Sequence, residues 1–361
     1  MAMSEIDRII EGCTECELCV EDCEFLKEAC QNPRELAERF SSGYFKENPR
    51  LPYSCNLCAL CERLCPEDLD IGKMCLEIRR QLVEEGLGPL PSHKRITEEQ
   101  EWISANFTLA MPDPDTGECN RIFFPGCNLS GYSPSLVINT YDYLRKKLPG
   151  TGIILGCCGN PIYCTGGSGE FQAALTYISA NMKQLGATEL IIACPECYHT
   201  FKNMGHFRLT SLYEVLAEQG IPDLYKKGEY TFSLHDSCPT RYEETLQESV
   251  RTLAKGMGYQ IEEMEYSRDK TRCCGMGGMI AYADLKLSNR IIKRRAAEAK
   301  HDVLTYCASC REAFGFLGKP SLHLLDLIFN PDWEQDRIKP AKLRVERKEN
   351  QVLLKSQLET I

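Results

Sequence analysis

The tripeptide CCG occurs twice in this chain, at residues 157–159 and 273–275. Two adjacent cysteines form only a strained disulfide, because an ordinary disulfide joins Cα atoms that lie further apart than those of neighbouring residues. Each pair occupies the same place in a longer pattern, which begins with a single cysteine and ends with a C-x2-C pair. A fold for this chain must therefore bring two five-cysteine sets into equivalent positions.

The repeat extends beyond the cysteines. The first copy contains RIFFPGC, GIILGCCG and ELIIACPEC, and the second contains YTFSLHDSC, TRCCG and HDVLTYCASC. The segments that follow, TSLYEVLAEQG at 210–220 and PSLHLLDLIFN at 320–330, also match. Corresponding cysteines are 111 to 116 residues apart, which indicates a duplicated domain.

Within each copy, short apolar runs alternate with amphipathic stretches such as 134–148 and 170–186, which predicts α/β domains with small parallel sheets. Several of the cysteines come directly after a predicted strand. Because α/β folds bind ligands at the carboxyl ends of parallel strands, we expect the five thiolates of each copy to converge at one sheet edge. We expect Gly159 and Gly275 to supply a positive φ or a close backbone approach to a bound ligand, and the GG pairs at 166–167 and 277–278 to mark further close approaches.

The N-terminal third carries a second cysteine pattern, C-x2-C-x2-C-x3-C, which occurs at Cys13, Cys16, Cys19 and Cys23 and again at Cys55, Cys58, Cys61 and Cys65. This spacing is typical of ferredoxins with two [4Fe–4S] clusters, in which the fourth cysteine of each run binds the other cluster. The sequence therefore predicts one cluster on Cys13, Cys16, Cys19 and Cys65, and the other on Cys55, Cys58, Cys61 and Cys23. The alternative is two four-cysteine zinc sites, which usually combine separated C-x2-C pairs.

Other residues near these motifs allow less specific predictions. Cys30, Cys75 and Cys164 are expected to be packed thiols rather than ligands. His235 could donate a proton near the second copy or could simply form a hydrogen bond at a strand end; His199 and His206 also lie near motifs. Lys202 and Arg311 could offset cluster charge, but solvated surface cations are the simpler expectation.

Composition narrows the class of protein. The chain has 22 cysteines and no evident export signal, which favours thiolate metal sites in a reducing compartment over disulfides. A net charge of −10 gives no basic field for nucleic acid, and the apolar runs are too short to cross a membrane. We expect a cytoplasmic protein, or one peripheral to the membrane through a partner. The run GMGGM at 275–279 does not match the G-x-G-x-x-G motif that binds dinucleotides. The chain therefore shows no means of accepting hydride from such a cofactor, and we expect partner proteins to supply electrons to its metal centres.

At these cysteines the sequence resembles the CCG-domain iron–sulfur oxidoreductases, and its domain order resembles heterodisulfide reductases in which the ferredoxin and CCG parts are fused. The resemblance implies that each five-cysteine set holds a noncubane [4Fe–4S] cluster. One set is Cys127, Cys157, Cys158, Cys194 and Cys197, and the other is Cys238, Cys273, Cys274, Cys307 and Cys310. It also implies that a disulfide binds between the two clusters, whose irons hold the separating sulfurs.

The expected function is therefore disulfide reduction with electrons that arrive through two ferredoxin-type clusters. The alternative is a non-catalytic electron relay between a quinone- or flavin-bearing partner and another carrier, and a zinc-bound scaffold is a third possibility. Expected partners are a flavoprotein or a membrane cytochrome- or quinone-linked donor, and a small-molecule disulfide.

The predicted division of the chain has five parts. These are a helical two-cluster ferredoxin-like domain at 1–90, a linker at 91–118 with one helix near Trp102, CCG domains at 119–225 and 226–332, and a charged tail at 333–361. The tail is expected to dock a partner or to be partly disordered.

Overall fold

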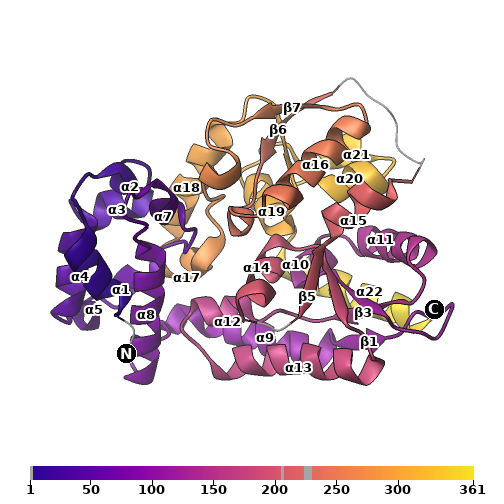
Figure 1. Cartoon of the computed structure of the whole chain (residues 1–361), viewed down its shortest axis with the longest axis horizontal. Helices are drawn as coiled ribbons and strands as arrows, with labels where there is room; N and C mark the ends of the chain where they lie inside the picture. Colours follow the sequence, from indigo (N-terminus) through magenta and orange to yellow (C-terminus); the bar gives the residue numbers. More distant parts are fainter. Residues whose placement is uncertain (1–2, 205–206, 223–229) are drawn as a thin grey trace.

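The computed structural model describes residues 3–204, 207–222 and 230–361 of the chain. Figure 1 shows the N-terminal helices, in indigo and purple, against one side of a body made of two lobes, each with its own sheet. The predicted boundary between the CCG domains, at 225–226, and His206 lie outside the described residues.

The N-terminal region is mostly helical. The α4 helix has a typical start, with the Asn32 side chain accepting a hydrogen bond from the Glu35 N–H at 3.0 Å and Pro33 in the first turn. The helices of this region are α1 (Glu5–Gly12), α2 (Leu18–Glu21), α3 (Glu24–Ala29), α4 (Pro33–Ser41), α5 (Tyr44–Glu47), α6 (Arg50–Tyr53), α7 (Leu60–Leu64) and α8 (Ile71–Glu84).

The first sheet has the strand order β1-β3-β2-β4-β5. Strands β2 to β5 are parallel, as predicted, whereas β1 pairs antiparallel with β3 at the edge. The strands are β1 (Leu109–Met111), β2 (Arg121–Phe124), β3 (Thr151–Leu155), β4 (Glu189–Ile192) and β5 (Arg208–Ser211). Every residue of β3 is buried, so its outer edge cannot remain unpaired. Strand β1, which lies in the segment predicted as a linker, pairs with this edge.

The predicted helix near Trp102 is α9 (Lys94–Asn106), which follows η1 (Pro91–His93). The remaining helices of the first lobe connect or flank its strands (Figure 1). They are α10 (Cys127–Tyr132), α11 (Pro134–Lys147), α12 (Asn160–Cys164), α13 (Gly169–Leu185), α14 (Pro195–Met204) and α15 (Leu212–Gln219).

The second sheet has the order β7-β6-β8-β9, and all its pairs are parallel. Its strands are β6 (Thr231–His235), β7 (Gln260–Glu263), β8 (Asp302–Thr305) and β9 (Ser321–His323). The order matches β3-β2-β4-β5 of the first sheet, so the duplication seen in the sequence is also a duplication of topology. The other elements are η2 (Cys238–Thr240), α16 (Glu244–Gly256), η3 (Arg268–Lys270), η4 (Gly277–Met279), α17 (Ile280–Ala283), α18 (Leu285–Ala297), α19 (Ala308–Phe316), α20 (Leu324–Phe329) and α21 (Trp333–Asp336).

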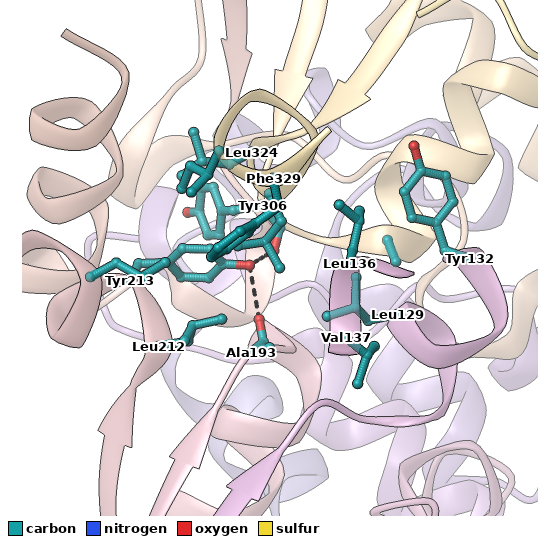
Figure 2. Packing of buried hydrophobic residues seen from close by; sticks show 14 of the residues in the cluster. Leu129, Tyr132, Leu136, Val137, Ala193, Leu212, Tyr213, Tyr306, Leu324 and Phe329 are labelled. Atoms are coloured by element: carbon teal, nitrogen blue, oxygen red, sulfur yellow. Dashed lines mark hydrogen bonds between the residues drawn. The ribbon is translucent and has the colours of Figure 1, made fainter. Parts of the chain in front are cut away.

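One hydrophobic core joins the two lobes. Leu212 and Tyr213 at the start of α15 pack in the same cluster as Leu324 and Leu325 at the start of α20. Figure 2 shows the Tyr213 ring in this cluster, with its hydroxyl hydrogen-bonded across the boundary. Burial of this apolar surface holds the two CCG domains in a fixed relative position.

The C-terminal segment is ordered, which corrects the expectation of a partly disordered tail; its docking of a partner stays a prediction. Helix α22 (Arg344–Glu359) returns to the first lobe and packs on α10 and α11. Gln351, Leu354 and Leu358 are buried at spacings of three and four residues, so they form one helix face. The polar composition of the segment concealed this narrow apolar stripe.

Among the described residues, no helix has both the length and the apolar character needed to span a bilayer.

Candidate metal centres

The cysteines of both CCG sets lie at or just beyond the carboxyl ends of the central strands. Cys127 follows β2, Cys157 and Cys158 follow β3, and Cys194 follows β4. In the second lobe, Cys238 and Cys307 follow β6 and β8 in the same way, whereas residues 264–272 separate β7 from the second CCG pair. Parallel strands therefore bring the thiols of each set to one edge of its sheet, as the strand pattern predicts.

The two sets face a single cavity, here called the cysteine cavity. Nine of the ten CCG cysteines line it, namely Cys127, Cys157, Cys158, Cys194, Cys197, Cys238, Cys274, Cys307 and Cys310. The thiols of Cys194 and Cys307 are hydrogen-bonded to each other, so the two sets meet across the boundary between the lobes. The domains are thus arranged with their cysteine edges toward each other.

Within each set the thiols also contact one another in matching ways. Hydrogen bonds from Cys157 and Cys197 lower the pKa of Cys158, and hydrogen bonds from Cys273 and Cys310 lower the pKa of Cys274. The Cys127 and Cys157 sulfurs lie 3.7 Å apart. The second cysteine of each CCG pair therefore favours the thiolate form, the form that binds metal.

The glycines of the CCG motifs have positive φ angles, +79° at Gly159 and +95° at Gly275. Their N–H groups donate to the sulfurs of Cys157 and Cys273 at 3.4 and 3.3 Å. A Cβ on Gly159 would lie 2.9 Å from the Phe171 ring in α13. The positive φ was predicted, but here the close neighbour is a packed helix, not the cavity.

The GG pairs mark contacts between backbones of different domains. A Cβ on Gly278 would lie 2.5 Å from the main-chain oxygen of Cys55, and a Cβ on Gly166 would lie 2.6 Å from that of Arg79. These glycines allow the N-terminal region to approach both CCG domains closely.

In the N-terminal region the eight cysteines form two groups. Burial and the charges of Cys65, Cys13 and Cys16 raise the pKa of Cys19 to about 12. Burial, then the charges of Cys55 and Cys58, raise the pKa of Cys23. The fourth cysteine of each run therefore lies beside the other run, and we call the groups the outer set (Cys13, Cys16, Cys19, Cys65) and the inner set (Cys23, Cys55, Cys58, Cys61).

The inner set contacts the second CCG domain. It lines a second cavity, the dicluster cavity, together with Cys273, the one CCG cysteine that does not line the cysteine cavity. The Cys58 thiol is hydrogen-bonded to Cys273, which is in turn hydrogen-bonded to Cys238. A continuous line of thiols thus connects the N-terminal region with the cysteine cavity.

The cysteines predicted to be packed lie outside these cavities. Cys75 and Cys164 are buried and Cys30 is half-buried. Cys75 nevertheless forms a hydrogen bond with the thiol of Cys55, so it supports the inner set from behind.

His235 is fully buried behind the second CCG set. Its Nδ1 accepts a hydrogen bond from Arg295 at 3.1 Å, and burial and this guanidinium lower its pKa to about 3. A ring nitrogen lies within 4.8 Å of the Cys274 and Cys310 sulfurs. A neutral, enclosed imidazole is suited to the strand-end hydrogen bond and not to proton delivery.

The two cations that follow the C-x2-C motifs differ. Lys202 is half-exposed and pairs with Glu243 at 2.5 Å, as expected of a surface cation. Arg311 is 1% exposed and pairs with Glu312, so its prediction as a solvated cation is wrong. The C-terminal segment covers Arg311, which donates to the main-chain oxygen of Lys339 at 2.8 Å.

Glu196, inside the first C-x2-C motif, also lines the cysteine cavity. Asn160 donates to its carboxylate at 2.6 Å, and burial and the charges of Cys307 and Cys158 raise its pKa to about 8. The second copy has Ser309 at the matching position, hydrogen-bonded to Asn128 at 2.7 Å. The cavity therefore has a carboxyl group on the side of the first CCG domain and a hydroxyl group on the side of the second. The only sequence signal for Glu196 was its position inside the C-x2-C motif.

A third cavity, the mouth cavity, adjoins the cysteine cavity and shares Cys127 and Cys157 with it. Its walls come from α9 and from the C-terminal segment, which contributes Lys342, Arg344 and Arg347. Apolar side chains such as Ile96 and Tyr282 complete the lining. Glu99 and Glu312 line the cavity as well, and Arg344 pairs with Glu99 at 2.6 Å, so Lys342 and Arg347 are the lining cations without a carboxylate partner among the described residues.

These donor sets fit iron–sulfur clusters. Each group consists of thiols that converge on a buried cavity or on one another, and thiolates are the ligands that such clusters use. No disulfide links any of the 22 cysteines, all of which lie in the described ranges.

Comparison with known families agrees with this geometry. The family model of the 4Fe-4S dicluster domain matches residues 12–70, and that of the cysteine-rich (CCG) domain matches residues 122–202 and 232–315. No solved structure matches the chain significantly.

Curated relatives share a quarter or less of their residues with the chain. One is a subunit of the CoM/CoB fumarate reductase of Methanothermobacter marburgensis, 24% identical over 90% of this chain and 73% of its own length. Another is a subunit of the dihydromethanophenazine:CoB–CoM heterodisulfide reductase of Methanosarcina acetivorans, 23% identical over 72% of this chain and 71% of its own. EtfAB:quinone oxidoreductase of Syntrophomonas wolfei is 24% identical over 63% of this chain and 36% of its own. With a dicluster domain followed by two CCG domains, the chain belongs to the CCG-domain iron–sulfur oxidoreductases. It is related to the heterodisulfide reductase subunit of Methanosarcina acetivorans.

Proposed function

We propose that this protein reduces a small-molecule disulfide at the cysteine cavity, with electrons that enter through the N-terminal clusters. One observation carries the proposal: nine of the ten cysteines of the two CCG sets line one cavity, and the sets touch through Cys194 and Cys307. A relay needs only clusters within tunnelling distance, whereas cleavage of a disulfide uses two matched sites because two sulfurs separate.

The proposed cofactors are four clusters. The outer and inner sets would each hold a cubane [4Fe–4S] cluster in a ferredoxin-like module, and each CCG set would hold a noncubane [4Fe–4S] cluster. The grouping of Cys65 with Cys19, and of Cys23 with Cys55 and Cys58, supports the crossed assignment of the cubanes. The proposed domain division is that predicted from the sequence, with β1 and α22 added to the first CCG domain.

The proposed electron route runs inward from the outer set. Cys16 is exposed, so the outer set is accessible to a donor protein such as a flavoprotein or a quinone-linked component. The contact between Cys58 and Cys273 then leads from the inner set to the second CCG set. The second CCG domain is thus the proposed point of entry into the cysteine cavity.

The overall reaction adds two electrons and two protons to the disulfide, breaks its S–S bond and releases two thiols. Bound clusters would supply the electrons and soft iron sites for the sulfurs. Asn160 orients the Glu196 carboxyl toward the cavity by its 2.6 Å hydrogen bond, and Asn128 orients the Ser309 hydroxyl on the other side. The mouth cavity, with Lys342 and Arg347, would admit a disulfide that carries an anionic group.

The test is reduction of low-molecular-weight disulfides by anaerobically purified protein with a reduced viologen dye as donor. We expect Cys158→Ser and Cys274→Ser to abolish turnover while the N-terminal clusters stay reducible. Cys164→Ser is the matched control, because this thiol is buried in the same domain as Cys158 but does not line the cavity.

The alternative function is an electron relay between a quinone- or flavin-bearing partner and another carrier. It is favoured if no disulfide is turned over and if added disulfide never perturbs the paramagnetic signal of the oxidised CCG clusters.

A further inference from the structure

Arg79 in α8 is a buried cation without a buried anion. Its exposure is 0%, and all five of its hydrogen bonds go to main-chain oxygens. These carbonyls belong to Pro52 and Cys55 of the N-terminal region, Cys164 of the first CCG domain and Gly278 of the second. No carboxylate among the described residues forms an ion pair with Arg79.

Arg241 repeats this arrangement at another cysteine of the inner set, Cys58. It is 3% exposed and donates to the main-chain oxygens of Cys58, Thr271 and Asp269, those of Cys58 and Thr271 at 2.9 Å. It too forms no ion pair within the described parts of the chain. The two guanidinium groups therefore bind the backbone of two inner-set cysteines, Cys55 and Cys58.

The other charges around the inner set balance one another. Arg272 and Arg294 pair with Asp22 at 2.5 and 3.1 Å, and Arg294 also pairs with Glu24 at 2.9 Å. Arg295, the third arginine of the dicluster cavity, pairs with Glu298 at 2.5 Å. Asp70 faces Cys61, but its carboxylate accepts the Lys73 N–H as the cap of α8, where the helix dipole offsets its charge. Within the part of the chain that the structure describes, Arg79 and Arg241 are the cations left uncompensated here.

Charges buried in protein are paired or neutralised, and an arginine cannot lose its proton. A cubane cluster with four thiolate ligands is a dianion in its oxidised form, and a nearby cation favours the more negative reduced form. The cation beside the outer set is different, because Arg34 is more than one-third exposed and pairs with Glu15 at 3.4 Å.

We propose that Arg79 and Arg241 are the charge partners of the cluster on Cys23, Cys55, Cys58 and Cys61, and that they hold its reduction potential above that of the outer cluster. The inner cluster, which lies next to Cys273, is then the one that is reduced first and passes electrons to the second CCG domain. This inference depends on the proposed cluster ligands. Arg79 and Arg241 act only through their positive charge, which stabilises the reduced inner cluster, and they have no part in breaking the disulfide.

The test is the midpoint potential of each N-terminal cluster, measured by redox titration with electron paramagnetic resonance. The inner signal is identified as the one that survives Cys16→Ala, which removes an exposed outer ligand. We expect Arg79→Met and Arg241→Met to shift the inner midpoint to lower potential and to leave the outer one unchanged. Arg79→Lys keeps the charge and should largely keep the potential.

Asp70→Asn is the control of opposite sign, because asparagine preserves the helix cap and removes a negative charge. It should raise the inner midpoint. An unchanged inner midpoint in Arg241→Met protein with full iron content would overturn the inference and leave the proposed function standing. By contrast, if no cluster signal survives in the Cys16→Ala protein, the ligand assignment itself is contradicted.

If Arg79→Met does not accumulate, a second comparison uses Arg241→Met with and without iron. The loss in thermal midpoint caused by this substitution should be larger in iron-loaded protein than in protein stripped by a chelator, because only the loaded protein contains the anion. Equal losses in the two forms would show that Arg241 is merely a structural donor to carbonyls.

Discussion

The Tyr213 hydroxyl donates to the main-chain oxygen of Tyr306 at 2.7 Å and lies 3.0 Å from that of Ala193 (Figure 2). Ala193 precedes Cys194 and Tyr306 precedes Cys307, so one hydroxyl bridges the two C-x2-C motifs. The cysteine cavity thus depends on a buried polar contact between the domains and not only on apolar packing.

Removal of this hydroxyl should destabilise the protein. Tyr213→Phe removes the donor between two buried carbonyls, which we expect to cost about 1–2 kcal/mol. The thermal unfolding midpoint of anaerobic protein measures the effect, and Tyr242→Phe, at an exposed tyrosine, is the control. Equal midpoints for the two variants would show that the bridge contributes nothing.

Iron content tests the crossed cluster assignment. We expect about 16 iron atoms per chain, and about 12 after either Cys65→Ala or Cys23→Ala. Cys65→Ala combined with Cys16→Ala should lose no further iron, because both residues belong to the outer set. Combined with Cys58→Ala, it should leave about 8 iron atoms; the reverse result would mean that each run binds its own cluster.

Arg347 tests the mouth cavity as the route of an anionic substrate. Arg347→Gln should raise the KM for 3,3′-dithiodipropionate about tenfold, the loss expected for one charge-assisted hydrogen bond. The KM for neutral bis(2-hydroxyethyl) disulfide should not change. Lys355→Gln, on the same helix but outside the cavity lining, is the control. A parallel rise for both disulfides would indicate a distorted helix.

The buried carboxyl of Asp326 should make the free energy of unfolding depend on pH. This carboxylate accepts hydrogen bonds from Tyr132 at 2.7 Å and His323 N–H at 2.9 Å, but burial raises its pKa to about 6. Because the folded pKa exceeds the unfolded value of 3.8, stability is lost as pH rises from about 4 to about 6 and then stays level.

Asp326→Asn should remove this loss, on the order of 2 kcal/mol. The measurement is the difference in unfolding midpoint between pH 4 and pH 7. If the wild type and the variant respond equally, Asp326 does not govern the pH response.

The sequence by itself determined the duplicated domain, the strands that end at cysteines and the cysteines that gather into sets. These follow from local patterns: cysteine spacing, hydrophobic periodicity and the need for glycine where φ is positive, as at Gly159 and Gly275. The cap at Asn32 and the helix near Trp102 were predictable for the same reason.

Only the tertiary structure decided how these parts meet. Contacts between distant residues bring Cys194 to Cys307, Cys58 to Cys273 and Arg79 to the backbone of three domains, and no local pattern encodes such pairings. Arg311 was expected at the surface because arginine usually is, yet the C-terminal segment covers it. That segment becomes ordered because a narrow apolar stripe, Leu354 and Leu358, is buried when α22 packs on α10 and α11, and the energy of such burial depends on the partner surface and not on the helix alone.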